Sequence, residues 1–233
     1  MGFEKQLGVS LGNLSEKFAV PFARTTDGPA SMILQTSIKF WPAEYHSQSA
    51  IEAALFLREQ IGEGVEVKSM TIESHDASVD IIGSEPEKWK PETRETADHS
   101  LPYITAVALI DGEVTEKQFQ PNRFKDPKIW KFLEKIKVER NAELSALYPG
   151  AVANIVHVEL ADGRRLTKRV DYPMGHARNR LKDSQVEEKF HALVDPMLGR
   201  DRASKIVEIA WELDAAKNVD DLMDACVVKE QID

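Results

Sequence analysis

Apolar and polar residues along this chain follow two spacings, one typical of strands and one typical of helices. Short apolar or alternating runs bounded by Gly, Pro or Asp predict strands at residues 33–40, 65–74, 136–143, 152–160 and 164–170. Apolar residues at helical spacing predict helices at residues 47–61, 100–110 and 127–136. A shorter apolar piece covers 79–82, residues 83–92 are expected to be a polar loop, and the chain beyond Asp171 is expected to be helical.

Residues with known positional preferences set several of these boundaries. Ser47 is a plausible N-cap for the first helix, with Gly62 after its last turn. Thr96 or Ser100 can start the next helix. The hairpin signal Ala161-Asp162-Gly163 joins two predicted strands. Because most strands lie beside a hairpin or short link, we expect an α+β fold with an antiparallel sheet and flanking helices rather than a doubly wound parallel sheet.

We expect three parts along the chain. Residues 1–35 are rich in glycine and apolar side chains without a sustained period, as in a segment that packs on another domain. Residues 36–178 form the α+β part, and residues 179–233 form a helical tail. The lead-in and the tail offer more apolar surface than a small sheet can cover, which is typical of an interface.

Charge and composition narrow the functional classes. The net charge of −9 and the scattered Lys and Arg residues argue against a nucleic-acid partner. The longest apolar run, Ile104–Ile110, is too short to cross a bilayer, and the first residues do not resemble a secretory signal. A single cysteine, Cys226, excludes an internal disulfide and fits a reducing compartment. We therefore expect a cytoplasmic protein without membrane association.

The densest group of chemically useful side chains lies at residues 39–48. Lys39 precedes Trp41-Pro42, and His46, Ser47 and Gln48 follow at the predicted helix start. A cation beside the free N–H groups of a helix N-terminus suits a carboxylate. The alternative is that Ser47 only caps the helix and Lys39 is only solvated.

Two further groups carry weaker signals. His99 and Tyr103 are four residues apart, so they share a face if both are helical, and they could donate to a substrate oxygen or transfer a proton. Tyr103 could equally be a core residue with a satisfied hydroxyl. His176, in a loop after Gly175, could be a ligand or a hinge residue. The histidines show no metal-ligand spacing and no phosphate-binding loop is present, so we expect no metal and no cofactor.

Three stretches in this order resemble the MmgE/PrpD family, which includes 2-methylcitrate dehydratase: SIKFWPAEYHSQSAIEAAL, ETADHSLPYITAVALIDG and YPMGHARNRLKDSQVEEKF. The third departs from the family pattern, which has Asn-Pro-Leu where this chain has Asn179-Arg180-Leu181. The resemblance extends over roughly residues 30 to 233.

The resemblance implies a lid-type α+β domain that closes on a large helical domain. Family members are metal-independent lyases, decarboxylases or epimerases of small polycarboxylates. In cis-aconitate decarboxylase relatives the lid contributes a lysine and a tyrosine that match Lys39 and Tyr103. The remaining catalytic groups, a His and an Asp among them, come from the helical domain and have no counterpart here. His46, Ser47, Gln48, His99 and His176 are the expected substrate-binding residues.

The expected function is therefore that of a hydro-lyase chain of the 2-methylcitrate dehydratase type, in propionate metabolism through the methylcitrate cycle. We expect it to be incomplete without a helical amino-terminal half, supplied by a separate chain or by a homodimer. One alternative is a non-catalytic fragment or self-associating module that binds carboxylates. Another is the same fold acting as a decarboxylase or epimerase.

Overall fold

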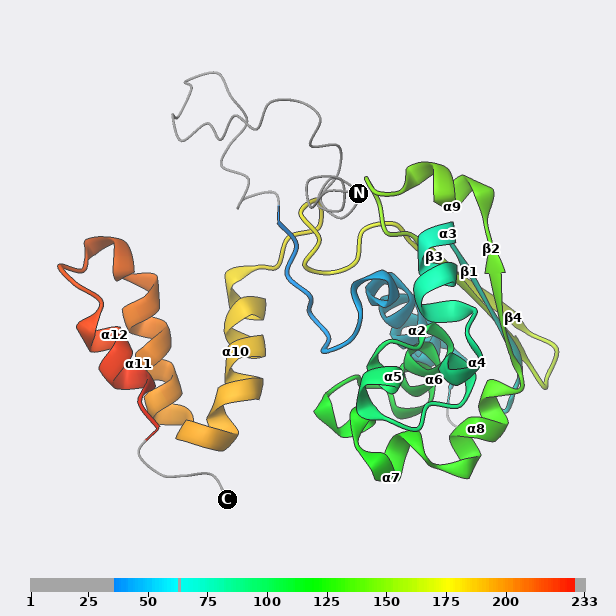
Figure 1. Cartoon of the computed structure of the whole chain (residues 1–233), viewed down its shortest axis with the longest axis horizontal. Coiled ribbons are helices and arrows are strands. Elements are labelled where there is room, and N and C mark those ends of the chain that lie inside the picture. The colour runs from blue at the N-terminus through cyan, green and yellow to red at the C-terminus, as the bar shows by residue number, and fades with distance from the viewer. Residues whose placement is uncertain (1–35, 63, 229–233) are drawn as a thin grey trace, which may run out of the picture. The chain divides into compact units, whose positions relative to one another are not determined.

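A computed structural model describes residues 36–62 and 64–228, and all but the first of these belong to the unit Ser37–Asp233 (Figure 1). The predicted lead-in at 1–35 lies outside the described residues. The division of the chain into three parts stays a prediction.

Four strands form one sheet with the order β2-β1-β3-β4. Its strands are β1 (Val67–Ser74), β2 (Ile136–Arg140), β3 (Asn154–Leu160) and β4 (Arg165–Val170). β3 pairs antiparallel with both β1 and β4, and the predicted hairpin joins β3 to β4. β1 and β2 pair in parallel, so the sheet is mixed and the expected purely antiparallel arrangement is wrong for this pair. The α+β class itself is confirmed.

One face of the sheet forms the core. Residues alternate between buried and half-buried along β1 and β3, and the cross-strand pairs Met70–Val158 and Ile72–Val156 are buried. Helix α2 (Gln48–Ile61) packs on β3 and β4 and also on α6 (Leu101–Asp111). α6 is buried from Leu101 to Leu109, which explains why it is apolar on every side.

Short helical elements fill the connections. Between β1 and β2 the chain forms α3 (Asp76–Ser78), η3 (Val79–Gly83), α4 (Pro86–Trp89), α5 (Arg94–Asp98), α6, η4 (Glu116–Phe119), α7 (Pro121–Phe124) and α8 (Pro127–Leu133). The tail comprises α10 (Asp183–Leu198), α11 (Arg200–Trp211), η5 (Leu213–Ala215) and α12 (Asp220–Cys226). Figure 1 shows α10, α11 and α12 following one another after β4.

Capping residues account for the boundaries that were predicted well. Ser100 accepts the backbone N–H of Tyr103 at the start of α6, and Gly112 ends that helix in the left-handed conformation. Asp126 accepts the N–H of Lys128 at the start of α8. α2 ends at Gly62 as expected.

Several boundaries need correction. Residues 36–40 are not a strand but an irregular segment, while 33–35 lie outside the described residues. The predicted strand at 136–143 ends at Arg140, because Asn141 caps the short helix α9 (Ala142–Leu147). The predicted loop at 83–92 contains α4, and 79–82 lie in the π-helical turn η3. The chain after Asp171 becomes helical only at Asp183.

Candidate active site

Lys39 lies in an irregular segment, residues 37–43, which leads into α2. We call it the Lys39 segment. The side chain of Lys39 is exposed, and within the described residues it has no hydrogen-bond or ion-pair partner. Its neighbours are all held in place. The Ser37 hydroxyl accepts hydrogen bonds from the Tyr45 hydroxyl at 3.0 Å and from the Ala177 N–H at 3.3 Å. A free ammonium on a fixed backbone is well placed to receive an anion.

The loop after β4 supports the Lys39 segment from one side. The Ile38 N–H donates to the Gly175 carbonyl at 2.8 Å. Gly175 has a φ of +88°, and a Cβ atom there would lie 2.0 Å from the Ile38 carbonyl oxygen. Only glycine permits both the backbone conformation and this close approach. The third motif of the sequence therefore supports the backbone on which Lys39 stands.

A second lysine reaches the same segment from the tail. Lys189 in α10 donates from Nζ to the Phe40 carbonyl at 2.8 Å, and its ammonium lies 6.0 Å from the Phe40 ring centre. Burial, followed by the charge of Lys39, lowers the pKa of Lys189 below its ordinary value. Lys189 lies in the third quoted stretch, but as one charge on a helix it gave no signal of this long-range contact.

The side chains of Gln48 and Ser47 bind backbone groups of this chain rather than facing an open site. The buried Gln48 side chain accepts from the Trp41 N–H and donates to the carbonyls of Trp41 and Ala43. The Ser47 hydroxyl donates to the Glu44 carbonyl at 2.6 Å and does not cap α2. A 3₁₀ turn, η2 (Tyr45–Ser47), precedes the helix and is capped by Glu44 instead. Their predicted contact with substrate stays untested, and both side chains are occupied in this structure.

Glu44, a residue that the sequence reasoning missed, contacts His46 directly. One Glu44 oxygen accepts the His46 backbone N–H at 2.7 Å, and the other lies 2.8 Å from His46 Nδ1. The Glu44 N–H donates to the Asp98 carbonyl at 2.9 Å, which ties the second motif to the first. Burial alone would raise the pKa of Glu44, but hydrogen bonds and charge from His46, with a smaller effect of His99, lower it below its ordinary value.

His99 does not share a helix face with Tyr103, contrary to the expected i, i+4 arrangement. His99 ends α5 and precedes the first turn of α6, so only Tyr103 is helical. The exposed His99 ring lies 2.5 Å from the Asp98 carboxylate and 3.1 Å from the Glu95 carbonyl. His99 is therefore an accessible imidazole at the junction of α5 and α6.

Tyr103 is fully buried, and its hydroxyl donates to the Gln118 carbonyl. Burial raises the pKa of Tyr103 above its ordinary value. No described contact links it to Lys39, so the structure of this chain does not bring the two expected catalytic residues together. In this structure Tyr103 is a core residue whose hydroxyl already has a hydrogen-bond partner, which was the alternative interpretation of its motif.

His176 organises its own loop. Its Nδ1 accepts the Arg178 N–H at 3.0 Å, and its ring lies 5.0 Å from that of Tyr172. Burial, together with the nearby charge of Arg178, lowers the pKa of His176 below its ordinary value. The imidazole is thus neutral at neutral pH and helps to hold the turn that supports Ile38.

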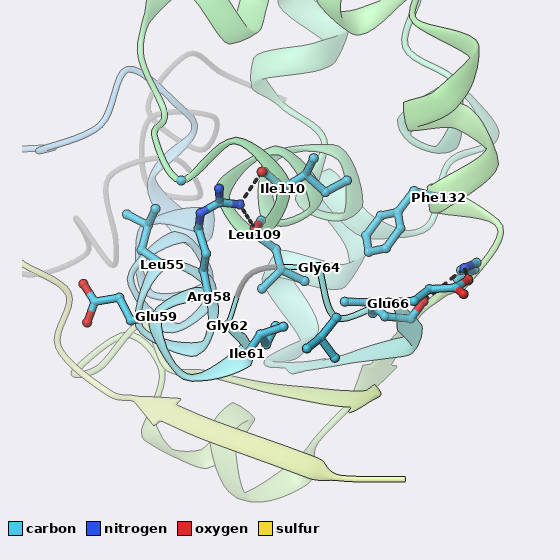
Figure 2. Close-up of a pocket in the computed structure, with 14 residues that line it drawn as sticks. Leu55, Arg58, Glu59, Ile61, Gly62, Gly64, Glu66, Leu109, Ile110 and Phe132 are labelled. Atoms are coloured by element: carbon cyan, nitrogen blue, oxygen red, sulfur yellow. Dashed lines mark hydrogen bonds and ion pairs between the residues drawn. The ribbon is translucent and has the colours of Figure 1, made fainter. Parts of the chain in front are cut away.

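A large cavity lies elsewhere, at the carboxyl end of α2. It has a volume of about 900 Å³ and is lined by Leu55, Arg58, Ile61, Leu109, Phe132 and Lys135, among others. Figure 2 shows Arg58 directed at the backbone of Leu109 and Ile110, whose carbonyls accept its hydrogen bonds. Lys135 is held by Glu66 and the Val67 carbonyl. Both cations of this cavity are thus already engaged.

Two further features bear on the class of site. The described residues contain no group of three or more His, Cys, Asp or Glu arranged to hold a metal ion. Among the helices of the same residues, none has the length and apolarity needed to cross a bilayer.

Comparison with known proteins identifies the family of this chain. The profile of the MmgE/PrpD C-terminal domain matches residues 41–215, and the chain belongs to this family. The 2-methylcitrate dehydratase of Escherichia coli (strain K12) is 34% identical over 149 residues, which are 60% of this chain and 30% of the relative. The mitochondrial 2-methylcitrate dehydratase of Yarrowia lipolytica is 26% identical over 200 residues, 82% of this chain and 38% of the relative.

A relative with another named activity is similar to a shorter part. The human cis-aconitate decarboxylase is 29% identical over 142 residues, which are 59% of this chain and 27% of that enzyme. The chain thus spans about a third or less of the length of most of the curated relatives it matches.

Proposed function

We propose that this chain forms one wall of a tricarboxylate site in a lyase of the 2-methylcitrate dehydratase type. The supporting observation is Lys39, whose ammonium has no partner in the described part of the chain. Its segment is held by hydrogen bonds at Ser37, Ile38, Phe40, Trp41 and Ala43. The names of the relatives point to 2-methylcitrate and cis-aconitate, which are both tricarboxylates. A substrate with three carboxylates needs several fixed cations, and Lys189 beside Phe40 adds a second.

Lys39 binds a carboxylate in this proposal and does not act as the base. A hydrogen bond between charged groups contributes about 1.5–3 kcal/mol, so one such contact changes affinity by about tenfold or more. Rigid attachment of the segment lowers the entropic cost of binding, because the ammonium stands on a backbone that is already ordered.

Tyr103 enters the proposal as a hydrogen-bond donor. Its hydroxyl has to exchange the Gln118 carbonyl for a substrate oxygen, so binding and a local rearrangement are coupled. Tyr103→Phe separates the two roles. Loss of stability without loss of turnover assigns Tyr103 to the core alone, whereas loss of turnover at equal stability supports donation to the substrate.

The rest of the site is proposed to come from a helical domain, carried by a separate chain or a second copy. The tail supports this, since large apolar side chains on α10–α12 and just beyond are exposed: Leu193, Met197, Trp211, Leu213, Val219, Met223, Val227 and Val228. Analytical ultracentrifugation tests it. We expect self-association or binding of a helical MmgE/PrpD amino-terminal half, and a stable monomer that does not bind ANS would contradict this.

The activity test follows alkene absorbance from 2-methylcitrate or citrate, with the chain alone and mixed with such a helical half. We expect Lys39→Ala to reduce kcat/KM at least about tenfold. Arg58→Ala, which removes a cation at the far end of α2, is the matched control and should retain turnover. Turnover unchanged in both Lys39→Ala and Tyr103→Phe would overturn the proposed site.

Decarboxylation is the second candidate, favoured by the human relative. Release of CO₂ from cis-aconitate by the same mixture would distinguish it from dehydration. Saturable binding without either product would indicate a carboxylate-binding module. The proposal places the activity in the cytoplasm and in propionate metabolism, as the alkene and CO₂ assays on cell extracts can test.

A further inference from the structure

Four titratable side chains gather at one end of the sheet, beside the start of α2. They are Glu44, His46, His75 and Tyr148, which come from the segment before η2, from η2, from the end of β1 and from the end of α9. The His46 and His75 ring centres are 5.1 Å apart. His75 and Tyr148 stack with centres at 4.5 Å and planes at 16°. The fold thus brings together four side chains that are far apart in the sequence.

Glu44 orients the His46 imidazole. Its carboxylate lies 2.8 Å from Nδ1 and also accepts the His46 backbone N–H at 2.7 Å. Nδ1 is buried and this contact lacks the geometry of a hydrogen bond, but the charge of a carboxylate at this distance still favours a proton on Nδ1 and leaves the lone pair on Nε2. Nε2 lies 3.5 Å from the Tyr148 hydroxyl. The arrangement is that of a base with its orienting carboxylate and a neighbouring hydroxyl.

His75 is a neutral side chain that packs against both His46 and Tyr148. It is fully buried, and its Nδ1 accepts the Ser78 N–H at 3.3 Å, so Nε2 carries the proton. Burial and then the charge of His46 lower the pKa of His75 to about 4. Its Nε2 has no partner among the described residues. A neutral imidazole stacked on Tyr148 holds the phenol without competing for the charge of Glu44.

Hydrogen bonds connect the cluster to the loop that holds the Lys39 segment. The Asn154 side chain donates to the His46 carbonyl at 2.8 Å, and Asn154 pairs with Val170 at the end of β4. The loop that follows Val170 supplies Gly175, which holds the Lys39 segment. The His46 side chain is 12% exposed and Tyr148 is 39% exposed, so both reach the surface there.

We propose that His46 is the proton acceptor of this site, with Glu44 and His75 as positioning residues and Tyr148 as the proton path. The inference rests on the proposed function, and it differs from what the family resemblance implies, which is a catalytic His in the helical domain. Here His46 supplies the base that an elimination from a tricarboxylate requires. Lys39 binds the carboxylate, and His46 acts on the carbon beside it.

The proton and electron balance closes within the cluster. The Nε2 lone pair takes the proton from the carbon next to a carboxylate, and the C–H electron pair becomes the C=C bond. The C–O bond on the adjacent carbon breaks, and the departing hydroxyl takes the Tyr148 proton to leave as water. The imidazolium then returns its proton to the Tyr148 phenolate, which restores both side chains.

The test uses the full-length, ¹⁵N-labelled chain and tricarballylate, a tricarboxylate without a hydroxyl that cannot undergo the elimination. Long-range ¹⁵N–¹H correlations report the tautomer of each imidazole. We expect His46 to carry its proton on Nδ1 and its Nε2 signal to shift saturably with the probe. His157, whose Nε2 lies 2.9 Å from Glu73, is the matched carboxylate–imidazole control in the same spectrum and should not shift.

A second arm tests Glu44 as a positioning residue. Glu44→Gln should abolish the Nδ1–H preference of His46, and Glu44→Asp should restore it at least in part. A role limited to capping η2 predicts instead that both variants keep the tautomer, since Gln and Asp can also accept the His46 backbone N–H.

The outcomes separate this inference from the proposed function. Saturable shifts at both the Lys39 segment amides and His46, with the same dissociation constant, support it. Shifts at residues 37–43 without any change at His46 overturn the base assignment and leave the carboxylate site standing. A proton on His46 Nε2 in the free chain would likewise overturn the base assignment and leave the carboxylate site standing. No saturable shift at either place overturns the carboxylate site, and the base assignment with it.

Discussion

The two ends of α2 differ in whether the cations near them already have hydrogen-bond or ion-pair partners. At its carboxyl end, Arg58 and Lys135 line a cavity of about 900 Å³, yet both cations are bound by carbonyls or by Glu66. At its amino end, Lys39 has no hydrogen-bond or ion-pair partner among the described residues, and the His46 ring contacts Glu44. Among the described residues, the cavity therefore has no free cation, whereas the amino end of α2 has one in Lys39.

This difference shows that the size of a cavity does not indicate whether its charged side chains are available to bind a ligand. The Arg58 guanidinium closes the carboxyl end of α6, where unpaired carbonyls need donors. The Lys39 ammonium carries no structural task, so its whole interaction energy is available to a ligand.

Gly175→Ala should have the largest effect at the amino end. The added Cβ would meet the Ile38 carbonyl at 2.0 Å, and the backbone has a φ of +88°. We expect a loss of at least about 3 kcal/mol in the free energy of unfolding. Gly163→Ala is the matched control, with φ +89° but open space, and should cost about 1 kcal/mol. Equal losses in urea denaturation would contradict the close approach.

His75→Asn tests the buried imidazole through pH. The folded-state pKa of His75, about 4, lies below the ordinary 6.5, so the unfolded chain binds the proton more tightly. Stability is fully present above pH 6.5 and is lost as the pH falls towards 4, by up to about 3 kcal/mol. Asparagine at this N-cap can still accept the Ser78 N–H, so the variant should lack this part of the slope. His157→Gln should retain it, and an unchanged slope in His75→Asn would refute the assignment.

Lys39→Ala should weaken tricarballylate binding by about tenfold and leave the free energy of unfolding within about 0.5 kcal/mol. Its side chain has no described partner to lose. Lys189→Ala should weaken binding too, but with a loss of stability, because its contact with the Phe40 carbonyl disappears. Calorimetry with Lys128→Ala, an exposed lysine in α8, as control separates these effects from net charge.

Arg58→Ala should have the smallest effect. Loss of its hydrogen bonds to the α6 carbonyls should cost about 1 kcal/mol of stability and leave tricarballylate binding unchanged. A binding loss as large as that of Lys39→Ala would move the candidate site to the other end of α2.

Local signals made part of the structure predictable. Ser100, Asp126 and Gly112 set helix ends by bonds within a few residues, so their motifs could be interpreted from sequence. The strand beginning at Ile136 was found, but its parallel pairing with β1 depends on residues more than sixty positions away. Pattern alone does not carry such register information.

The position of the candidate site could be predicted from the sequence, but the roles of its individual residues could not. The motif at 172–179 does contact the start of the Lys39 segment, through Ser37 and Ile38, yet Gln48 binds the backbone of that segment rather than facing an open surface. Glu44 was overlooked because residues two apart do not face each other in regular helices, whereas a 3₁₀ turn with its cap lets Glu44 reach His46. Lys189 and Tyr148 contact their partners across about a hundred residues or more, which no spacing rule anticipates.

The bond between Lys189 and residue 40 has an evolutionary consequence. Its acceptor is a main-chain oxygen, which every amino acid supplies, so this hydrogen bond itself places no demand on the side chain at position 40. The donor has no such freedom, because only a long flexible cation spans that gap. Among related chains we therefore expect lysine to be retained at position 189 even where another apolar side chain replaces the Phe40 ring, which packs on the core.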